Sequence, residues 1–142
     1  MKHIECTYKV VSLLFMALVL GLIISCKKKG PTEDDYLKAI ANMAAKSQSE
    51  CPKVKSNGIR LESVIFTPKD TILTYRLSIS DEAIITVNVN DSNTRKNIID
   101  ELSGQLKEYL VKGKCKLKYQ YVSPHDSSYI EILPSELDNS RQ

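Results

Sequence analysis

The chain lacks the residue patterns that mark most catalytic sites. It has no tryptophan, two histidines and five glycines spread singly over 142 residues. It therefore contains neither a glycine-rich phosphate loop nor a histidine cluster suited to a metal. The formal net charge is only +3, which does not favour nucleic acid as a partner. We accordingly expect no enzymatic activity, no metal and no cofactor.

Long hydrophobic runs are also scarce, and the sequence has one at its start. Residues 10–24 carry no charge and follow a segment with Lys2 and Lys9. This run is shorter than the roughly 20 residues that a spanning helix needs, and it has the length of the apolar part of a secretory signal. It ends in Leu22-Ile23-Ile24-Ser25-Cys26, and three lysines follow.

These five residues resemble the lipobox of bacterial lipoproteins, in which aliphatic and small residues precede a cysteine. The resemblance implies that residues 1–25 are a signal peptide and that Cys26 becomes the first residue of the mature chain, carrying the covalent lipid. Ile24 and Glu5 are atypical of the pattern. Two alternatives stay open: an uncleaved transmembrane anchor, which the basic residues 27–29 would also suit, and a secreted form without lipid.

The residue after the lipidated cysteine suggests a location. In enteric bacteria an aspartate there retains lipoproteins in the inner membrane, and in Bacteroidetes-type organisms an acidic motif resembles a surface-export signal. Lys27 matches neither pattern. By this analogy we expect a lipid-anchored protein of the cell envelope, at the outer membrane and facing the periplasm.

Two cysteines remain after processing, because Cys6 leaves with the signal and Cys26 carries lipid. An even pair in an oxidising compartment favours a disulfide, so we expect Cys51 and Cys115 to pair and to close a loop of about 65 residues. The alternatives are two free buried thiols or redox chemistry, and no CxxC motif supports the second.

The mature chain divides into a tether (26–31), a single α+β domain (32–134) and a polar C-terminal tail (135–142). Thr32 is a suitable N-cap for a first helix, which must end before Pro52. A second helix is expected from Asp91 or Ser92 to Gly113, with Gly113 in the left-handed conformation that ends many helices.

Period-two alternation of apolar residues predicts five strands. They lie near residues 59–65, 73–79, 85–89, 115–121 and 129–133. Most links are too short for parallel crossovers, so we expect a two-layer, mostly antiparallel sheet with two helices on one face, in the order α-β-β-β-α-β-β. The similar turns at 67–71 and 123–127 allow either an internal duplication or two independent hairpins.

The most distinctive charge pattern is a row of lysines. Lys114, Lys116 and Lys118 alternate along a predicted strand, and Arg60 and Arg76 lie on the polar faces of other strands. Together they predict a positive surface on the open side of the sheet for an anionic partner, either an envelope protein or another anionic envelope component. The plainer interpretation, which we favour, is a solvated strand face whose lysines hinder aggregation.

Other candidate residues have structural explanations. His125 is expected in a surface turn, and Tyr75, Tyr109, Tyr119 and Tyr121 fall on predicted core faces. We therefore expect a non-enzymatic envelope lipoprotein that acts as a binding or interaction module. The alternatives are a small immunity or inhibitor lipoprotein, a structural lipoprotein, or an accessory envelope hydrolase. The hydrolase would need a pocket with converging titratable groups.

Overall fold

The computed structural model describes residues 29–56, 58–81 and 91–138. The predicted signal peptide, the lipobox and the strand expected at residues 85–89 lie outside the described residues. The described residues from Pro31 to Asp138 form one compact unit. Its elements are α2 (Glu33–Ser49), β1 (Lys53–Ser56), β2 (Ile59–Thr67), β3 (Ile72–Ile79), α4 (Ser92–Glu101), α5 (Gly104–Lys112), β4 (Lys116–Val122), β5 (Ser127–Ile132) and α6 (Pro134–Asp138).

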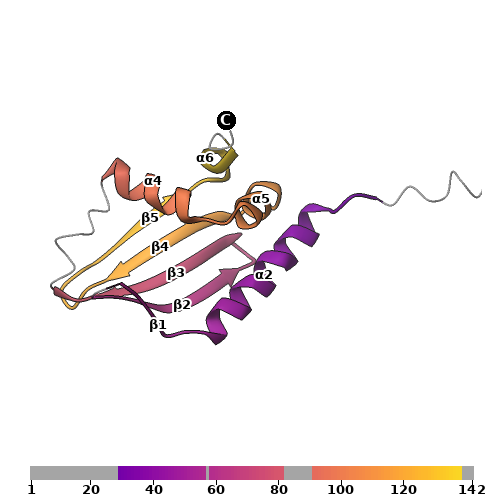
Figure 1. Ribbon diagram of the computed structural model, residues 1–142. Coiled ribbons are helices and arrows are strands. Elements are labelled where there is room, and N and C mark those ends of the chain that lie inside the picture. Colours follow the sequence, from indigo (N-terminus) through magenta and orange to yellow (C-terminus); the bar gives the residue numbers. More distant parts are fainter. Residues whose placement is uncertain (1–28, 57, 82–90, 139–142) are drawn as a thin grey trace, which may run out of the picture. The chain divides into compact units, whose positions relative to one another are not determined.

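The described strands form one five-stranded sheet in the order β1-β2-β3-β4-β5. Neighbouring strands are antiparallel except for β3 and β4, which are parallel. The chain between β3 and β4 includes α4 and α5, as parallel neighbours need a long crossover connection. The prediction of an α+β fold with a mostly antiparallel sheet is confirmed (Figure 1).

Alternation along the strands separates a helix-covered face from an open face. In β3 the buried residues are Leu73, Leu77 and Ile79, while Arg76 on the other face is exposed. The buried core consists of Ile40, Ala44, Leu61, Val64, Leu73, Leu77, Ile79, Ile98, Leu102, Leu106, Leu110, Cys115, Leu117, Tyr121, Ile130, Ile132 and Leu137. Because all core residues of the strands lie on one face, the other face is left to solvent.

The N-terminus of α2 is built as the sequence predicts. The backbone N–H of Asp35 donates to the Thr32 hydroxyl (3.4 Å), and the carboxylate of Asp35 accepts from the backbone N–H of Thr32 (2.9 Å). This reciprocal capping box satisfies two N–H groups that the first turn of a helix leaves without partners. It fixes where the domain begins after the expected tether.

The helix predicted over residues 92–112 is broken into two. Asp91 caps α4 as expected, but Leu102 is extended (φ −68°, ψ 134°) and ends this helix. The Ser103 side chain then caps α5 by accepting from the Leu106 N–H at 3.2 Å. Leu102 is itself buried, so the break places an apolar side chain in the core.

Gly113 is not in the left-handed conformation, so that prediction is wrong. Its φ is −83°, and Lys114 instead takes a positive φ of 50°. A Cβ at Gly113 would lie 2.9 Å from the Tyr109 carbonyl oxygen and 3.2 Å from Leu37 Cδ2. Glycine therefore avoids a close contact with the preceding turn of α5 and a second, less severe one with side chains of α2.

Two elements were not expected from the sequence. The edge strand β1 is exposed along its whole length. The polar tail expected from residue 135 instead begins with α6, because Leu137 is fully buried. Arg95 fixes α6 by donating to the Glu131 carbonyl (2.9 Å) and to the Glu136 carboxylate (2.7 Å), which joins α4, β5 and α6.

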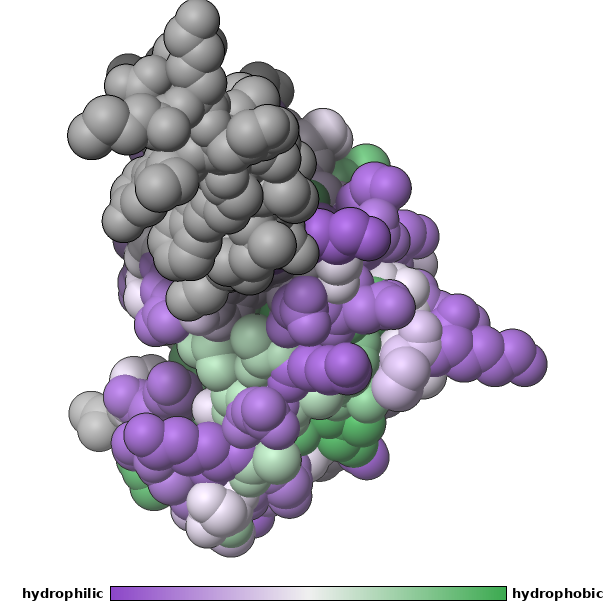
Figure 2. Space-filling model, turned by 90° about the vertical axis from the view of Figure 1, so that its right-hand side faces the viewer, coloured by the Kyte–Doolittle hydropathy of each residue, from purple (hydrophilic) through white to green (hydrophobic). Residues whose placement is uncertain are grey.

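The surface seen from the right-hand side of Figure 1 is mostly hydrophilic where it is described, and a smaller hydrophobic area lies between the hydrophilic side chains (Figure 2). No helix in the described part of the chain is long and apolar enough to cross a membrane.

Candidate functional site

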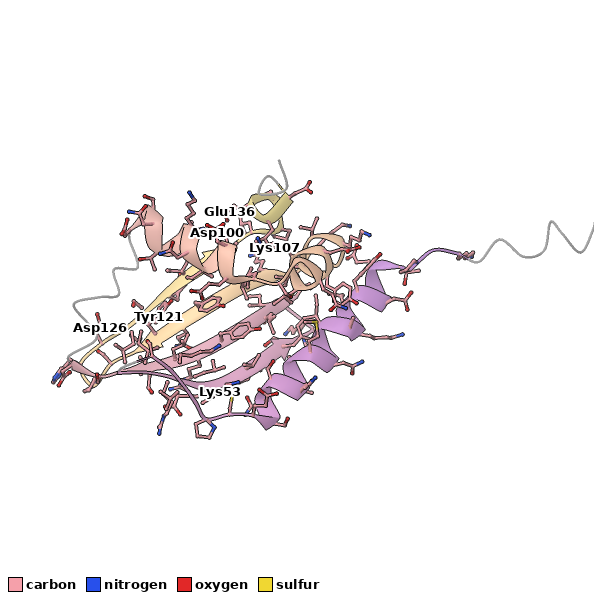
Figure 3. All side chains as sticks on the ribbon, in the orientation of Figure 1. Lys53, Asp100, Lys107, Tyr121, Asp126 and Glu136 are labelled. Carbon is pink, nitrogen blue, oxygen red and sulfur yellow. The ribbon has the colours of Figure 1, made fainter. Side chains whose placement is uncertain are left out.

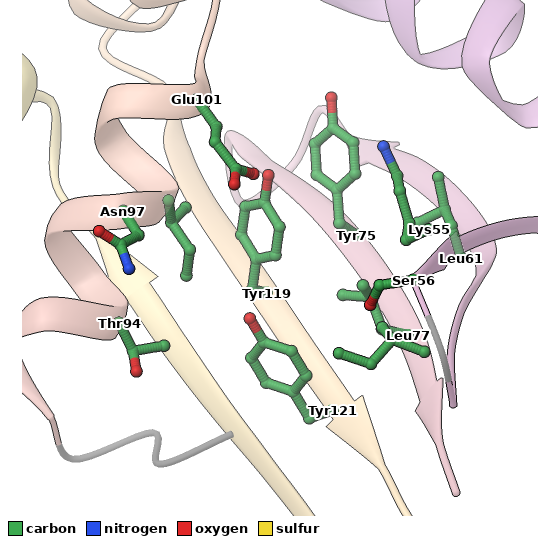
Figure 4. A pocket seen from close by; sticks show the side chains of 12 residues that line it. Lys55, Ser56, Leu61, Tyr75, Leu77, Thr94, Asn97, Glu101, Tyr119 and Tyr121 are labelled. Carbon is green, nitrogen blue, oxygen red and sulfur yellow. The ribbon is translucent and has the colours of Figure 1, made fainter. Parts of the chain in front are cut away.

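A cleft of about 300 Å³ opens on the helix-covered face of the sheet. Its floor is formed by β2, β3 and β4, and α4 and β1 form two of its sides (Figure 4). The lining residues are Lys55, Ser56, Ile59, Leu61, Tyr75, Leu77, Thr94, Asn97, Ile98, Glu101, Tyr119 and Tyr121. Aromatic and apolar side chains thus make up most of its floor.

Three tyrosines from two neighbouring strands dominate the cleft. Tyr75 of β3 and Tyr119 of β4 are register partners, and their rings stack 5.1 Å apart at an interplanar angle of 8°. Tyr121 points to the same face, and its ring centroid is 6.4 Å from that of Tyr119. The parallel pairing of β3 and β4 thus aligns the three rings, and Tyr121 is only 7% exposed.

The hydroxyl groups of these tyrosines are held protonated. Burial raises the pKa of Tyr75, Tyr119 and Tyr121 above the ordinary value. The negative charge of Glu101 raises the pKa of Tyr119 and Tyr121 further, because a second anion nearby would be repelled. Within the described residues none of the three hydroxyls has a hydrogen-bond partner, so they can both donate to and accept from a bound group.

The α4 wall presents one helical stripe to the cleft. Thr94, Asn97, Ile98 and Glu101 recur at positions i, i+3, i+4 and i+7, which share a helix face. Glu101 directs its carboxylate toward the Tyr119 hydroxyl, and Lys55 lies across the cleft beside Tyr75 and Leu61 (Figure 4). The cleft therefore combines apolar floor, neutral hydroxyls and one charge on each side.

The sequence signal for this site was incomplete. The placement of Tyr75, Tyr119 and Tyr121 on the helix-covered face was predicted, but these side chains were assigned to packing alone. Glu101 and Asn97 were missed, although the stripe on α4 could have identified them by its spacing. Only the three-dimensional arrangement shows that the stripe faces the tyrosines.

The predicted lysine row is only partly correct. Lys116 and Lys118 of β4 lie on the open face with Arg60 and Arg76. Lys114 precedes the strand and forms an ion pair with Glu33 of α2 at 2.7 Å, so it does not belong to this surface. The positive φ at Lys114 takes it out of the strand alternation.

The remaining charges on the open face are partly compensated. Lys116 lies 3.3 Å from the Glu131 carboxylate, and Arg60 Nε lies 2.7 Å from Glu62. The Lys118 ammonium lies 4.4 Å from the ring centroid of Tyr129, a cation–π contact. These contacts agree with a solvated strand face and leave the anionic-partner hypothesis without a formed binding site.

The structure does not support the expected disulfide, since Cys51 and Cys115 are free thiols in it. Cys51 donates to the Ser47 carbonyl (3.3 Å), and Cys115 is fully buried.

His125 lies in the turn between β4 and β5, where its side chain is 79% exposed and 3.8 Å from Asp81. Among the described residues no group of three His, Cys, Asp or Glu side chains is placed to hold a metal ion.

No protein-family model and no curated protein sequence matches the chain. Its fold is similar to two solved structures. A protein of Pseudomonas aeruginosa described as secreted superposes with a TM-score of 0.62 at 14% identity, covering 77% of this chain and 99% of its own. The pilotin EpsS of the Vibrio vulnificus type 2 secretion system superposes with a TM-score of 0.58 at 8% identity, covering 77% and 97%. At these identities the likeness establishes a shared fold.

Proposed function

We propose that this chain is a non-enzymatic lipoprotein of the bacterial envelope whose tyrosine-lined cleft binds a segment of a protein partner. In this proposal Cys26 carries the lipid that holds the protein at the outer membrane, facing the periplasm. The observation that carries it is the cleft between α4 and β1, with the stacked pair Tyr75 and Tyr119 on its floor.

The composition of the cleft supports a binding role. Tyrosine offers a large rigid apolar ring with a polar end, and it is enriched at the centres of protein interfaces. A volume of about 300 Å³ is at the lower end for ligand pockets, so it suits a few anchoring side chains of a partner. The two formal charges, on Glu101 and Lys55, lie on opposite sides of the cleft (Figure 4).

The class of partner follows from where the protein is expected to reside. The resemblance of residues 22–26 to a lipobox supports a place in the envelope, and one of the two similar structures is a pilotin of a type 2 secretion system. The other is described as secreted. We therefore propose an envelope protein as the partner, with components of secretion machinery as the first class to test.

Site-specific photo-crosslinking in the bacterium that produces the protein tests this proposal. A benzophenone side chain replaces Lys55, an exposed residue at the β1 rim of the cleft, and a matched variant carries it at Tyr129, which is 60% exposed on the open face. We expect a discrete protein adduct from the Lys55 position and a much weaker one from the Tyr129 position. Equal adducts from both positions, or none from Lys55, would contradict a partner in the cleft.

The anchor is tested by mass spectrometry of wild type and Cys26→Ser. Wild type is expected to be cut before Cys26 and to carry acyl chains there, each buried methylene of which contributes about 0.8 kcal/mol to membrane binding. The variant should carry no lipid and should keep residues 1–25. A wild-type protein without lipid on Cys26 would contradict the lipid anchor while leaving the cleft to be judged by the crosslinks.

A further inference from the structure

Glu101 occupies a position at which a carboxylate destabilises its own helix. It is the last residue of α4, the residue before it is Asp100, and the last turn contains no basic residue. The C-terminus of a helix carries a partial negative charge, so carboxylates there are unfavourable by a few tenths of a kcal/mol to about 1 kcal/mol. Helix stability therefore does not account for Glu101.

The two acids at this helix end have different surroundings. Glu101 lines the cleft and Asp100 does not. Asp100 lies on the upper side of α4 in Figure 3, whereas Tyr121 lies below the helix. Asp100 is therefore a matched control for Glu101, with the same kind of charge at the same helix end.

Acceptor atoms converge on the α4 side of the cleft. The Glu101 carboxylate is directed toward the Tyr119 hydroxyl (Figure 4), and its charge acts on both Tyr119 and Tyr121. Tyr121 is more than nine-tenths buried, and within the described residues its hydroxyl has no hydrogen-bond partner. Glu101 likewise has no ion pair within the described part of the chain. An exposed carboxylate at the edge of the cleft, beside two hydroxyls without partners among the described residues, offers a site for a cation with several N–H donors.

We propose that the cleft selects a partner segment that presents an arginine or lysine side chain to Glu101, Tyr119 and Tyr121. This inference rests on the proposed function and names the chemistry of the partner. The charged head hydrogen-bonds to the Glu101 carboxylate and to the two hydroxyls. The methylene stem lies along the apolar part of the cleft, where Leu77 and Ile98 line it.

Lys55 on the opposite side limits where a cation can bind. Its ammonium group disfavours a basic side chain near Tyr75 and would instead attract an acidic one. The basic residue of the partner is therefore expected on the α4 side, and a preference for acidic residues would mean that Lys55 determines specificity.

A peptide-display selection tests the inference on the lipidated protein in detergent micelles. A library of random dodecapeptides is selected against wild type, Glu101→Gln, Asp100→Asn and a variant with the cleft filled, Thr94→Trp. Circular dichroism confirms that each variant is folded. Peptides that bind wild type and not Thr94→Trp are taken as cleft-dependent, and their affinities are measured by titration at low and high salt.

The inference predicts that arginine and lysine are enriched among the cleft-dependent peptides of wild type and Asp100→Asn, and not of Glu101→Gln. A selected basic peptide should bind Glu101→Gln about tenfold more weakly, as expected for the loss of a charge-assisted hydrogen bond. Cleft-dependent peptides without a basic preference, or with an acidic one, would overturn this inference and leave the proposed function standing. If no peptide depends on the cleft, the proposed function fails as well.

Discussion

Replacing Gly113 by alanine tests why a glycine ends α5. Its φ of −83° is accessible to any residue, so backbone conformation does not require glycine there. The added Cβ would lie 2.9 Å from the Tyr109 carbonyl oxygen, 3.2 Å from Leu37 Cδ2 and 3.4 Å from Ile40 Cδ1. The contact with the carbonyl is the severe one, because a backbone atom cannot rotate away.

Two effects of opposite sign determine how much Gly113→Ala changes the free energy of unfolding. Overpacking in a close-packed region costs about 1–3 kcal/mol. The lower entropy of the unfolded chain with alanine returns about 0.4–1 kcal/mol. We expect Gly113→Ala to lower the free energy of unfolding by about 1–2 kcal/mol. With a urea dependence of about 1–3 kcal/mol per M, the unfolding midpoint should fall by roughly 0.3–2 M.

Urea unfolding followed by circular dichroism measures this shift, and Gly104→Ala is the control. Gly104 is the first residue of α5, and a Cβ there meets nothing within 4 Å, so alanine should be neutral or stabilising. Gly113→Asn separates packing from conformation. Packing makes asparagine worse than alanine because it is larger, whereas a left-handed conformation would make asparagine the better tolerated residue. A Gly113→Ala protein as stable as wild type would refute the packing argument.

Two further predictions concern titratable groups. Burial raises the pKa of the Cys115 thiol to about 11, so in the folded protein at pH 8 we expect Cys115 not to react with a thiol reagent. After denaturation without reductant, mass spectrometry should show that both Cys51 and Cys115 are labelled. A disulfide-linked pair would contradict the free thiols. Hydrogen bonds from the backbone and side chain of Thr32 lower the pKa of Asp35 in the folded state. The stability that ionised Asp35 provides is therefore present above its unfolded pKa of about 3.9. It is lost as the pH falls toward the lower folded pKa. The difference in unfolding free energy between wild type and Asp35→Asn should therefore be constant above about pH 5 and shrink below pH 4, and a difference that grows as pH falls would contradict this assignment.

The strands and the first helix were predictable because their signals are local. Thr32 followed by three acids marks the start of α2, and Leu73, Leu77 and Ile79 alternate with polar residues along β3. These patterns arise from burial on one face and from capping of one helix end, and both effects leave a trace in consecutive residues. Whether Cys51 and Cys115 pair depends on the distance between two separate elements, and no local sequence pattern encodes that distance.

The missed elements lack an apolar period. Lys53 to Ser56 form β1 at the edge of the sheet, where every side chain is exposed and alternation is not required. Helix α6 has five residues and one buried side chain, Leu137, and depends on Arg95 forty-one residues away from Glu136. Contacts of that sequence separation can be found only in the folded structure.

The break between α4 and α5 links the missed helix boundary to the missed cleft. Ile99, Leu102 and Leu106 continue the i, i+3, i+4 apolar spacing across the break, so the pattern is the same for one helix or two. A single helix would continue past Glu101 in the direction of α4. Because α4 ends there, α5 packs on α2 through Gly113, while the stripe from Thr94 to Glu101 faces the tyrosines. Because Leu102 is extended, the axes of α4 and α5 point in different directions. Helix α5 closes the core, and α4 borders the candidate binding site.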